Sequence, residues 1–192
     1  ELAKIQQLAN RRRSLVRQRP TDLAGVAALL EDCITLGTIP FSILARHAFI
    51  AQSLLRSLVA RKLLNLAEAD ALMASVHTVA GEMADDCRDL VGGSLDRHEF
   101  LERYGHLRPG TYDIISARYD QRDDLFMGAT AIAAPTPAAT FTLSAGQMRR
   151  IDGMLADEDL CIDASALFDY IGEATAAREY AKFVFTRNLS DA

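Results

Sequence analysis

The sequence has little of what marks several familiar classes of protein. It has only three cysteines, Cys33, Cys87 and Cys161, and none of them falls in a CxxC pair or a Cys/His pair with zinc-finger spacing. This scarcity argues against a disulfide scaffold and predicts reduced thiols in a cytoplasmic protein. No secretory signal peptide is visible. The alternation of apolar and polar residues that is typical of amphipathic strands is also almost absent.

Motifs for well-known chemistry are missing too. The sequence contains no P-loop, no GxGxxG and no GxSxG, so the common nucleotide and hydrolase signatures are absent. The segment HEFLE, residues 98–102, resembles a zinc protease helix, but Glu102 stands where the second histidine should be. No third ligand is indicated, and no ExxH pair suggests a di-iron site. We therefore predict no metal and no cofactor in this chain.

Neither a membrane nor a nucleic acid is predicted as a partner. The longest apolar run, around residues 39–60, is interrupted by polar side chains, which favours a buried helix over a membrane span. These polar residues are Arg46, His47, Gln52 and Arg56. The basic run at residues 11–13 lacks interleaved aromatic residues. It is therefore interpreted as a solvated helix face rather than a nucleic-acid surface.

Helical spacing of apolar residues runs through most of the chain. It predicts helices at 2–18, 22–36, 40–63, 66–90, 95–104, 145–156 and 164–187. Asn65-x-x-Glu68 and Ser144-x-x-Gln147 have the pattern of capping boxes. The predicted fold class is all-α, an irregular helical bundle of about six to seven helices with a long connecting loop.

The long loop is predicted at 128–140, where the residues are small, uncharged and include proline. We expect one helical domain over 1–192, with a subdivision into 1–127 and 141–192 as the alternative. Residues 1–66 carry ten Lys or Arg against four Asp or Glu, and the remainder carries eleven against twenty-two. This polarity favours pairing with a neighbouring domain or a second copy. The chain opens in helical rhythm without Met, so we expect a piece of a longer protein.

Special residues concentrate in FLERYGHLRPGTYDI, residues 100–114. Gly105 breaks the preceding helix, and Pro109-Gly110 suits a type II turn that would display the side chains around it. Arginine offers a planar fork for carboxylate or phosphate, and histidine can relay a proton. The candidate substrate-binding residues are therefore His106, Arg108, Tyr112, Asp113 and Arg118. In the alternative interpretation, Arg108 and Asp113 pair and pin the loop to the bundle.

Four stretches also resemble a known family: FLERYGHLRPGTYDIISARYD, GTIPFSILARHAFIAQSLLRSL (37–58), REYAKFVFTRNLSDA (178–192) and SVHTVAGEMADD. They are similar to the helical middle region of phosphoenolpyruvate-synthase-like proteins, relatives of pyruvate phosphate dikinase and rifampicin phosphotransferase. The resemblance implies that the longer protein uses ATP and magnesium. It also implies neighbouring ATP-grasp and phosphohistidine domains, and a small-molecule phosphoryl acceptor of unknown identity.

The chain lacks the family's motifs for binding ATP and for carrying the phosphoryl group. The Thr-x-His motif of the phosphohistidine domain is absent, and so is any glycine-rich ATP-grasp loop. No catalytic residue is assigned. The predicted function is therefore an acceptor-binding or domain-positioning region of a phosphotransferase that is inactive alone. The alternative is a non-catalytic helical scaffold or protein-interaction domain.

Overall fold

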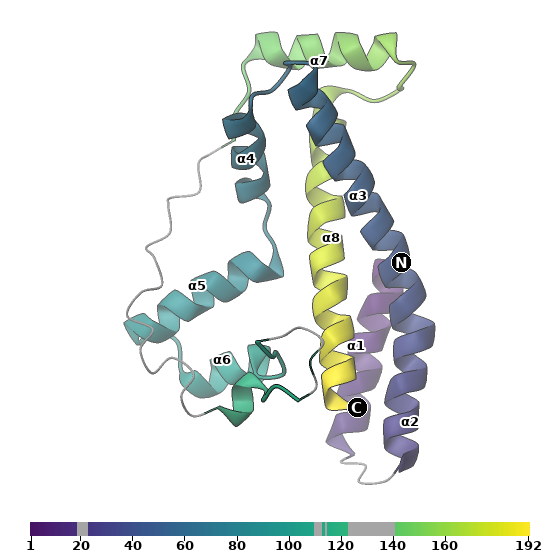
Figure 1. Cartoon of the computed structure of the whole chain (residues 1–192), viewed down its shortest axis with the longest axis vertical. Helices are drawn as coiled ribbons and strands as arrows, with labels where there is room; N and C mark the ends of the chain where they lie inside the picture. Colours follow the sequence, from purple (N-terminus) through teal and green to yellow (C-terminus); the bar gives the residue numbers. More distant parts are fainter. Residues whose placement is uncertain (19–22, 110–112, 114, 123–140) are drawn as a thin grey trace. The chain divides into compact units, whose positions relative to one another are not determined.

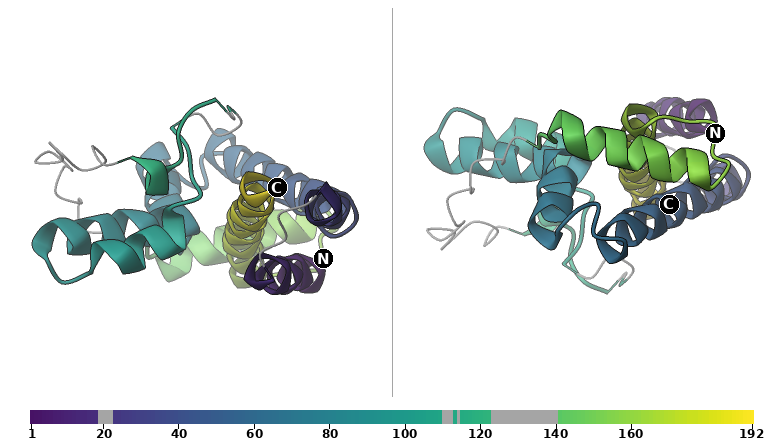
Figure 2. Two further views of the ribbon diagram at one scale, coloured as in Figure 1. Left: turned by 90° about the horizontal axis from the view of Figure 1, so that it is seen from below. Right: turned by 90° about the horizontal axis from the view of Figure 1, so that it is seen from above.

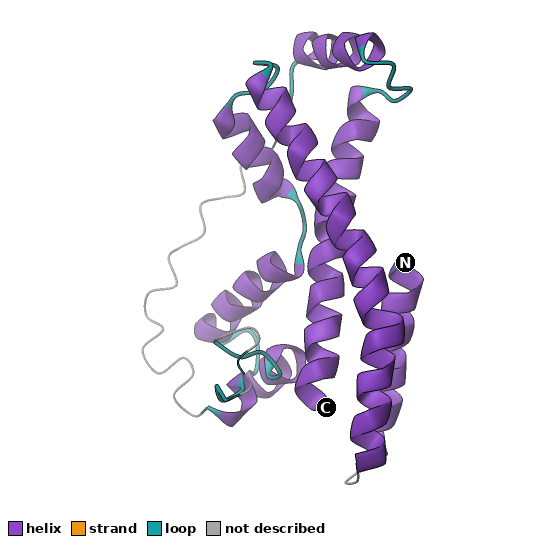
Figure 3. Cartoon of the chain, turned by 45° about the vertical axis from the view of Figure 1, so that its right-hand side comes forward, coloured by secondary structure: helices purple, strands orange, loops and turns teal. Residues whose placement is uncertain are grey.

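The computed structural model describes residues 1–18, 23–109, 113, 115–122 and 141–192. These residues form helices and loops, and no strand occurs among them (Figure 3). The α-helices are α1 (Leu2–Arg17), α2 (Leu23–Asp32), α3 (Ile39–Ala60), α4 (Leu66–Ser75), α5 (Val79–Gly92), α6 (Arg97–Tyr104), α7 (Ala145–Asp157) and α8 (Ala164–Asp191) (Figure 1). A π-helix, η1 (Cys33–Thr38), and a 3-10 turn, η2 (Tyr119–Gln121), complete the set. The predicted all-α fold class is confirmed.

The chain forms two compact units, each built from segments that are distant in sequence. Unit 1 comprises Glu1–Ile43, Val79–Ala134 and Glu179–Ala192, and unit 2 comprises Leu44–Thr78 and Pro135–Arg178. Helices α3 and α8 each contribute residues to both units. The loop predicted at 128–140 lies outside the described residues, and the division into 1–127 and 141–192 stays a prediction.

Unit 1 is held by close packing of its helices. Ile5 and Leu8 of α1 are fully buried. In η1, a Cβ added to Gly37 would lie 2.8 Å from the Phe185 ring of α8, so only glycine lets the two elements approach this closely. A second apolar cluster joins α5 and α6 to α8, and its members include Cys87, Phe100, Tyr104 and Phe183.

A continuous helix runs from Leu23 to Ala60, because α2, η1 and α3 follow one another without a break. The prediction of two helices, 22–36 and 40–63, is therefore wrong at their junction. The π-helical stretch lies just before Pro40, which has no N–H to donate and would break a regular α-helix. By length and composition alone this helix is apolar enough to cross a membrane, a test that core helices of soluble proteins also pass.

Unit 2 has one apolar core between α3, α4, α7 and the first half of α8. Its fully or nearly fully buried members include Ala51, Leu58, Ile151, Leu155, Leu167 and Ile171. Helix α7 lies crosswise over α8, with the C-terminal end of α3 to one side (Figure 2). Both predicted capping boxes are present, at Asn65/Glu68 and at Ser144/Gln147.

The predicted helix 66–90 is wrong, because it is two helices. Helix α4 ends at Ser75, and Val76 is extended with φ −72° and ψ 120°. The Ser75 hydroxyl donates to the Leu72 carbonyl at 2.7 Å, which satisfies a carbonyl near the helix end. The β-branched Val76 and Thr78 favour an extended backbone over a helix. No glycine or proline marks this break, so the helical spacing of apolar residues continues through it and predicted a single helix.

Candidate functional site

The loop after α6 belongs to unit 1 and is closed by backbone hydrogen bonds. The Tyr119 amide donates to the Leu107 carbonyl at 2.8 Å, and the Asp120 amide donates to the Gly105 carbonyl at 3.0 Å. A Cβ added to Gly105 would lie 2.3 Å from the Leu101 carbonyl oxygen and 2.9 Å from Asp120 Cβ. Gly105 therefore ends α6 as predicted, and its close approach to η2 requires the absence of a side chain.

His106 is buried, although the sequence predicts a displayed side chain at this position. Its residue is only 4% exposed, and its ring packs edge-on against Phe183 with centroids 4.8 Å apart. Neither ring nitrogen has a hydrogen-bond partner in the part of the chain that the structure describes. Burial, reinforced by the Arg187 cation, lowers the pKa of His106 to about 3, although Asp191 opposes the shift. The imidazole is therefore neutral at pH 7.

Arg108 and Asp113 bind the loop itself. Arg108 is half-buried, and its Nη1 donates to the Ser116 carbonyl at 2.5 Å. The Asp113 carboxylate accepts from the Ser116 hydroxyl at 2.5 Å and from the Ile115 amide at 3.0 Å. These two hydrogen bonds lower the pKa of Asp113, and the Arg108 charge acts in the same direction. Tyr112, with Gly110 of the predicted turn, lies outside the described residues.

Arg118 ties the loop to the end of α8. Its guanidinium forms a bidentate pair with Asp120, Nε to Oδ1 at 3.0 Å and Nη2 to Oδ2 at 2.7 Å. Its Nη1 also donates to Asp191 Oδ1 at 2.9 Å and to the Ser190 carbonyl at 3.1 Å. Burial of Arg118 disfavours its charged form, but the hydrogen bonds to the two aspartates outweigh burial and raise its pKa. The fork of Arg118 is thus occupied by groups of unit 1.

Arg118 and Asp120 belong to a charged cluster with three further residues that were not predicted from the sequence: Arg12, Arg187 and Asp191. Arg12 pairs with Asp191 through both Nε and Nη2. Its side chain is 13% exposed, so the interpretation of residues 11–13 as a solvated face is wrong for Arg12. Arg187 donates to the Glu102 carbonyl at 2.6 Å and to the Arg103 carbonyl at 3.3 Å, which satisfies the C-terminal end of α6.

One signal for this cluster was available in the sequence. Arg187 and Asp191 are four residues apart and share a face of α8, which extends to Asp191, whereas the predicted helix ended at 187. Their partners come from positions about 70 to 180 residues away in the chain, which local spacing does not reveal. Burial lowers the pKa of Arg187, and the nearby Arg12 cation acts in the same direction.

The positive and negative side chains of this cluster neutralise one another. Arg12 and Arg118 share the Asp191 carboxylate, and Arg118 also holds Asp120. His98 and Glu102, the residues of the zinc-protease-like segment, are both exposed. Among the described residues no group of three or more His, Cys, Asp or Glu is placed to hold a metal ion. The hydrogen bonds of Arg12, Arg118 and Arg187 are directed at carboxylates and carbonyls of the chain itself, and Arg187 Nε is buried without a partner among the described residues.

Comparison with protein-family models, with curated proteins and with solved structures finds no match for this chain.

Proposed function

We propose that this chain is a non-catalytic helical region that positions neighbouring domains in a larger phosphoenolpyruvate-synthase-like phosphotransferase. The observation that carries the proposal is the occupied state of Arg118, which binds Asp120 and Asp191 and fixes the 105–122 loop to α8. A loop held in this way supplies a rigid attachment point. It has fewer donors left for a substrate than a displayed turn would have.

The remaining candidates in the loop fit the same role. His106 is buried and neutral at pH 7, which suits packing better than proton transfer to an exposed substrate. Arg108 supports the loop through the Ser116 carbonyl. The family assignment itself rests on the four stretches of sequence similarity. ATP, magnesium, the ATP-grasp domain and the phosphohistidine domain would belong to the rest of the longer protein.

The proposal is tested by separating the two half-reactions of the longer protein. Asp191→Asn should leave phosphorylation of the carrier histidine by ATP intact and lower kcat for transfer to the acceptor, with the acceptor KM unchanged. This pattern follows if loosening the loop misplaces a domain without touching the acceptor. Arg108→Ala serves as the comparison. A raised acceptor KM in Arg108→Ala, with normal transfer in Asp191→Asn, would instead assign acceptor binding to the loop.

A further inference from the structure

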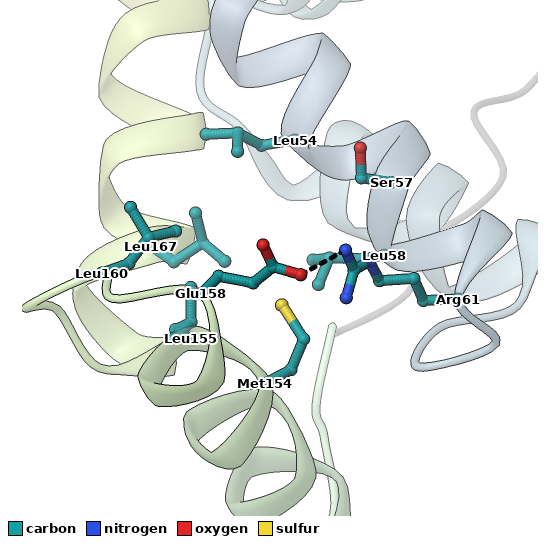
Figure 4. Close-up of a pocket in the computed structure, with 9 residues that line it drawn as sticks. All are labelled: Leu54, Ser57, Leu58, Arg61, Met154, Leu155, Glu158, Leu160 and Leu167. Carbon is teal, nitrogen blue, oxygen red and sulfur yellow. Dashed lines mark hydrogen bonds and ion pairs between the residues drawn. The ribbon is translucent and has the colours of Figure 1, made fainter.

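Unit 2 contains a pocket of about 270 Å³ where the C-terminal ends of α3 and α7 meet the start of α8 (Figure 4). Its wall is mainly apolar and is formed by Leu54, Leu58, Met154, Leu155, Leu160 and Leu167. Arg61 and Glu158 add one charge of each sign to the lining. A mostly apolar wall with a few polar groups is the usual composition of a small-molecule site, and this volume is just below the common range of about 300–1,000 Å³.

The two helix ends beside this pocket are built alike. The residues after Arg61 and Glu158 are Lys62, with φ 58°, and Asp159, with φ 56°, and no other described non-glycine residue has a positive φ. Each end is closed by the same type of backbone hydrogen bond. The Leu63 amide donates to the Leu58 carbonyl at 3.0 Å, and the Leu160 amide donates to the Leu155 carbonyl at 2.9 Å. This is the Schellman motif, which usually has glycine at the positive-φ position.

This geometry sets the charge of the pocket. The Schellman ends place the C-terminal carbonyls of α3 and α7 nearby, so the negative ends of two helix dipoles lie beside the pocket, against the positive end of one, at the start of α8. Arg61 Nη2 donates to Glu158 Oε1 at 2.5 Å, and the two side chains are 51% and 48% exposed. Glu158 Oε2 has no hydrogen-bond partner in the described part of the chain, and it points away from Arg61 toward the leucines (Figure 4).

We propose that this pocket binds a small amine, with an apolar body among the leucines and its ammonium group on Glu158 Oε2. The ammonium can join Glu158 without displacing Arg61, because the carboxylate has a second oxygen available. It also benefits from both helix ends. A carboxylate ligand would have to compete with Glu158 for Arg61 and would face the same helix ends. The volume suits one ring or a short alkyl chain.

The test compares three probes that share a ring: 2-phenylethylamine, 2-phenylethanol and 3-phenylpropionate. Binding is followed through the methyl resonances of the methionines by NMR, with Met154 in the pocket and Met83 of unit 1 as an internal reference. The amine should shift the Met154 signal in a saturable way and leave Met83 unchanged. Its affinity should fall as salt is added, because the contact with Glu158 is exposed enough to be screened.

Two variants and a control make the test specific. Glu158→Gln keeps the shape of the side chain and removes its charge, so the amine should bind about tenfold more weakly, as expected for the loss of one charge-assisted hydrogen bond. Ser57 also lines the pocket, so Ser57→Phe should fill it and abolish the shift, with folding checked by circular dichroism. Glu173→Gln, on the exposed side of α8, should bind as the wild type does.

Three outcomes would overturn the proposal. The first is the lack of any saturable Met154 shift with the amine in the wild type. The second is equal affinity of Glu158→Gln and the wild type for the amine. The third is binding of 3-phenylpropionate as tight as that of the amine, which would show that Glu158 gives the pocket no preference for a cation.

Discussion

Arg118 and Asp191 are joined by a 2.9 Å hydrogen bond between Nη1 and Oδ1, although 73 residues separate them in the chain. The side chains are 19% and 10% exposed, so the pair is largely shielded from water. The Asp191 carboxylate also pairs with Arg12, and the Arg118 guanidinium also pairs with Asp120. The end of α8 thus becomes the point where α1 and the 105–122 loop meet.

Breaking this pair should destabilise unit 1. Removing one partner from a buried ion pair costs roughly 3–5 kcal/mol, because the other charge is left without compensation. Arg12 still neutralises Asp191, so we expect about 2–3 kcal/mol for Arg118→Ala in urea denaturation. The double variant with Asp191→Asn should lose less than the sum of the single losses.

Arg88→Ala provides the matched control for this prediction. Arg88 pairs with Asp85 one helical turn away, and both side chains are well exposed at 38% and 62%. Exposed pairs of this kind contribute about 0–1 kcal/mol. Equal losses in Arg118→Ala and Arg88→Ala, or strict additivity of the double variant, would show that the Arg118–Asp191 contact does not hold the loop.

His106 should make the stability of the protein depend on pH. Its pKa is about 3 in the folded chain and near 6.5 when unfolded. Between these values the unfolded chain binds a proton that the folded chain excludes, so the free energy of unfolding falls as the pH decreases. The expected loss is about 1.4 kcal/mol per pH unit below about pH 6.5, ending near pH 3. Urea denaturation at intervals from about pH 7 to about pH 4 measures it.

His106→Leu should remove most of this pH dependence. The leucine cannot bind a proton, and it replaces two ring nitrogens that lack partners among the described residues, so its stability at pH 7 should match or exceed the wild type. His98→Gln is the control, since His98 is exposed on α6 and its loss should leave the pH profile unchanged. An unaltered slope in His106→Leu would assign the acid sensitivity to other groups.

The capping boxes should contribute measurable stability to unit 2. The Asn65 side chain accepts from the Glu68 amide at 2.9 Å, and the Glu68 carboxylate accepts from the Asn65 amide at 2.7 Å. Asn65→Ala should cost about 1 kcal/mol in thermal or urea unfolding, the usual loss for such a cap. Asn65→Gly should cost only about a few tenths of a kcal/mol, because glycine readily adopts the backbone conformation of an N-cap. An Asn65→Ala loss close to zero would exclude a side-chain cap.

The sequence predicted features that depend on neighbours in the chain. The capping boxes at Asn65 and Ser144 and the helix end at Gly105 each need only three or four residues to be recognised, and all three are present. The all-α class follows from periodicity in the same way. By contrast, the break after Ser75 has no glycine or proline to mark it, and the helix through Pro40 depends on a π-helical stretch that periodicity does not reveal.

The candidate site was harder to predict, because its geometry depends on distant partners. Spacing identified Arg118 and His106 as notable but could not show that Arg118 meets Asp191 or that Phe183 covers His106. Arg12 was assigned to a solvated face for the same reason. A polar residue in a loop has the same sequence signature whether it faces a ligand or the C-terminal helix, and only long-range packing distinguishes the two.

Gly105 offers the sharpest test of how the loop is closed. A methyl group at this position would lie 2.3 Å from the Leu101 carbonyl oxygen and 2.9 Å from Asp120 Cβ, and neither neighbour is the end of a flexible side chain. The backbone φ of −56° is open to any residue, so the obstacle is space rather than conformation. Gly105→Ala should therefore force the η2 turn away from α6 and cost about 1–3 kcal/mol, the usual range for overpacking.

The matched control for Gly105→Ala is Gly153→Ala, in the interior of α7. An added Cβ there meets no atom within 4 Å, so the change should stabilise the helix by roughly 0.5–1 kcal/mol, the difference in helix propensity. The two substitutions are chemically identical and are expected to have opposite signs in urea denaturation. Since Asp120 and Arg118 belong to the displaced turn, Gly105→Ala combined with Arg118→Ala should lose less than the sum of the two single losses. Full additivity would mean that the Gly105 contact and the Arg118 pin act independently, and that the loop is not held as one piece.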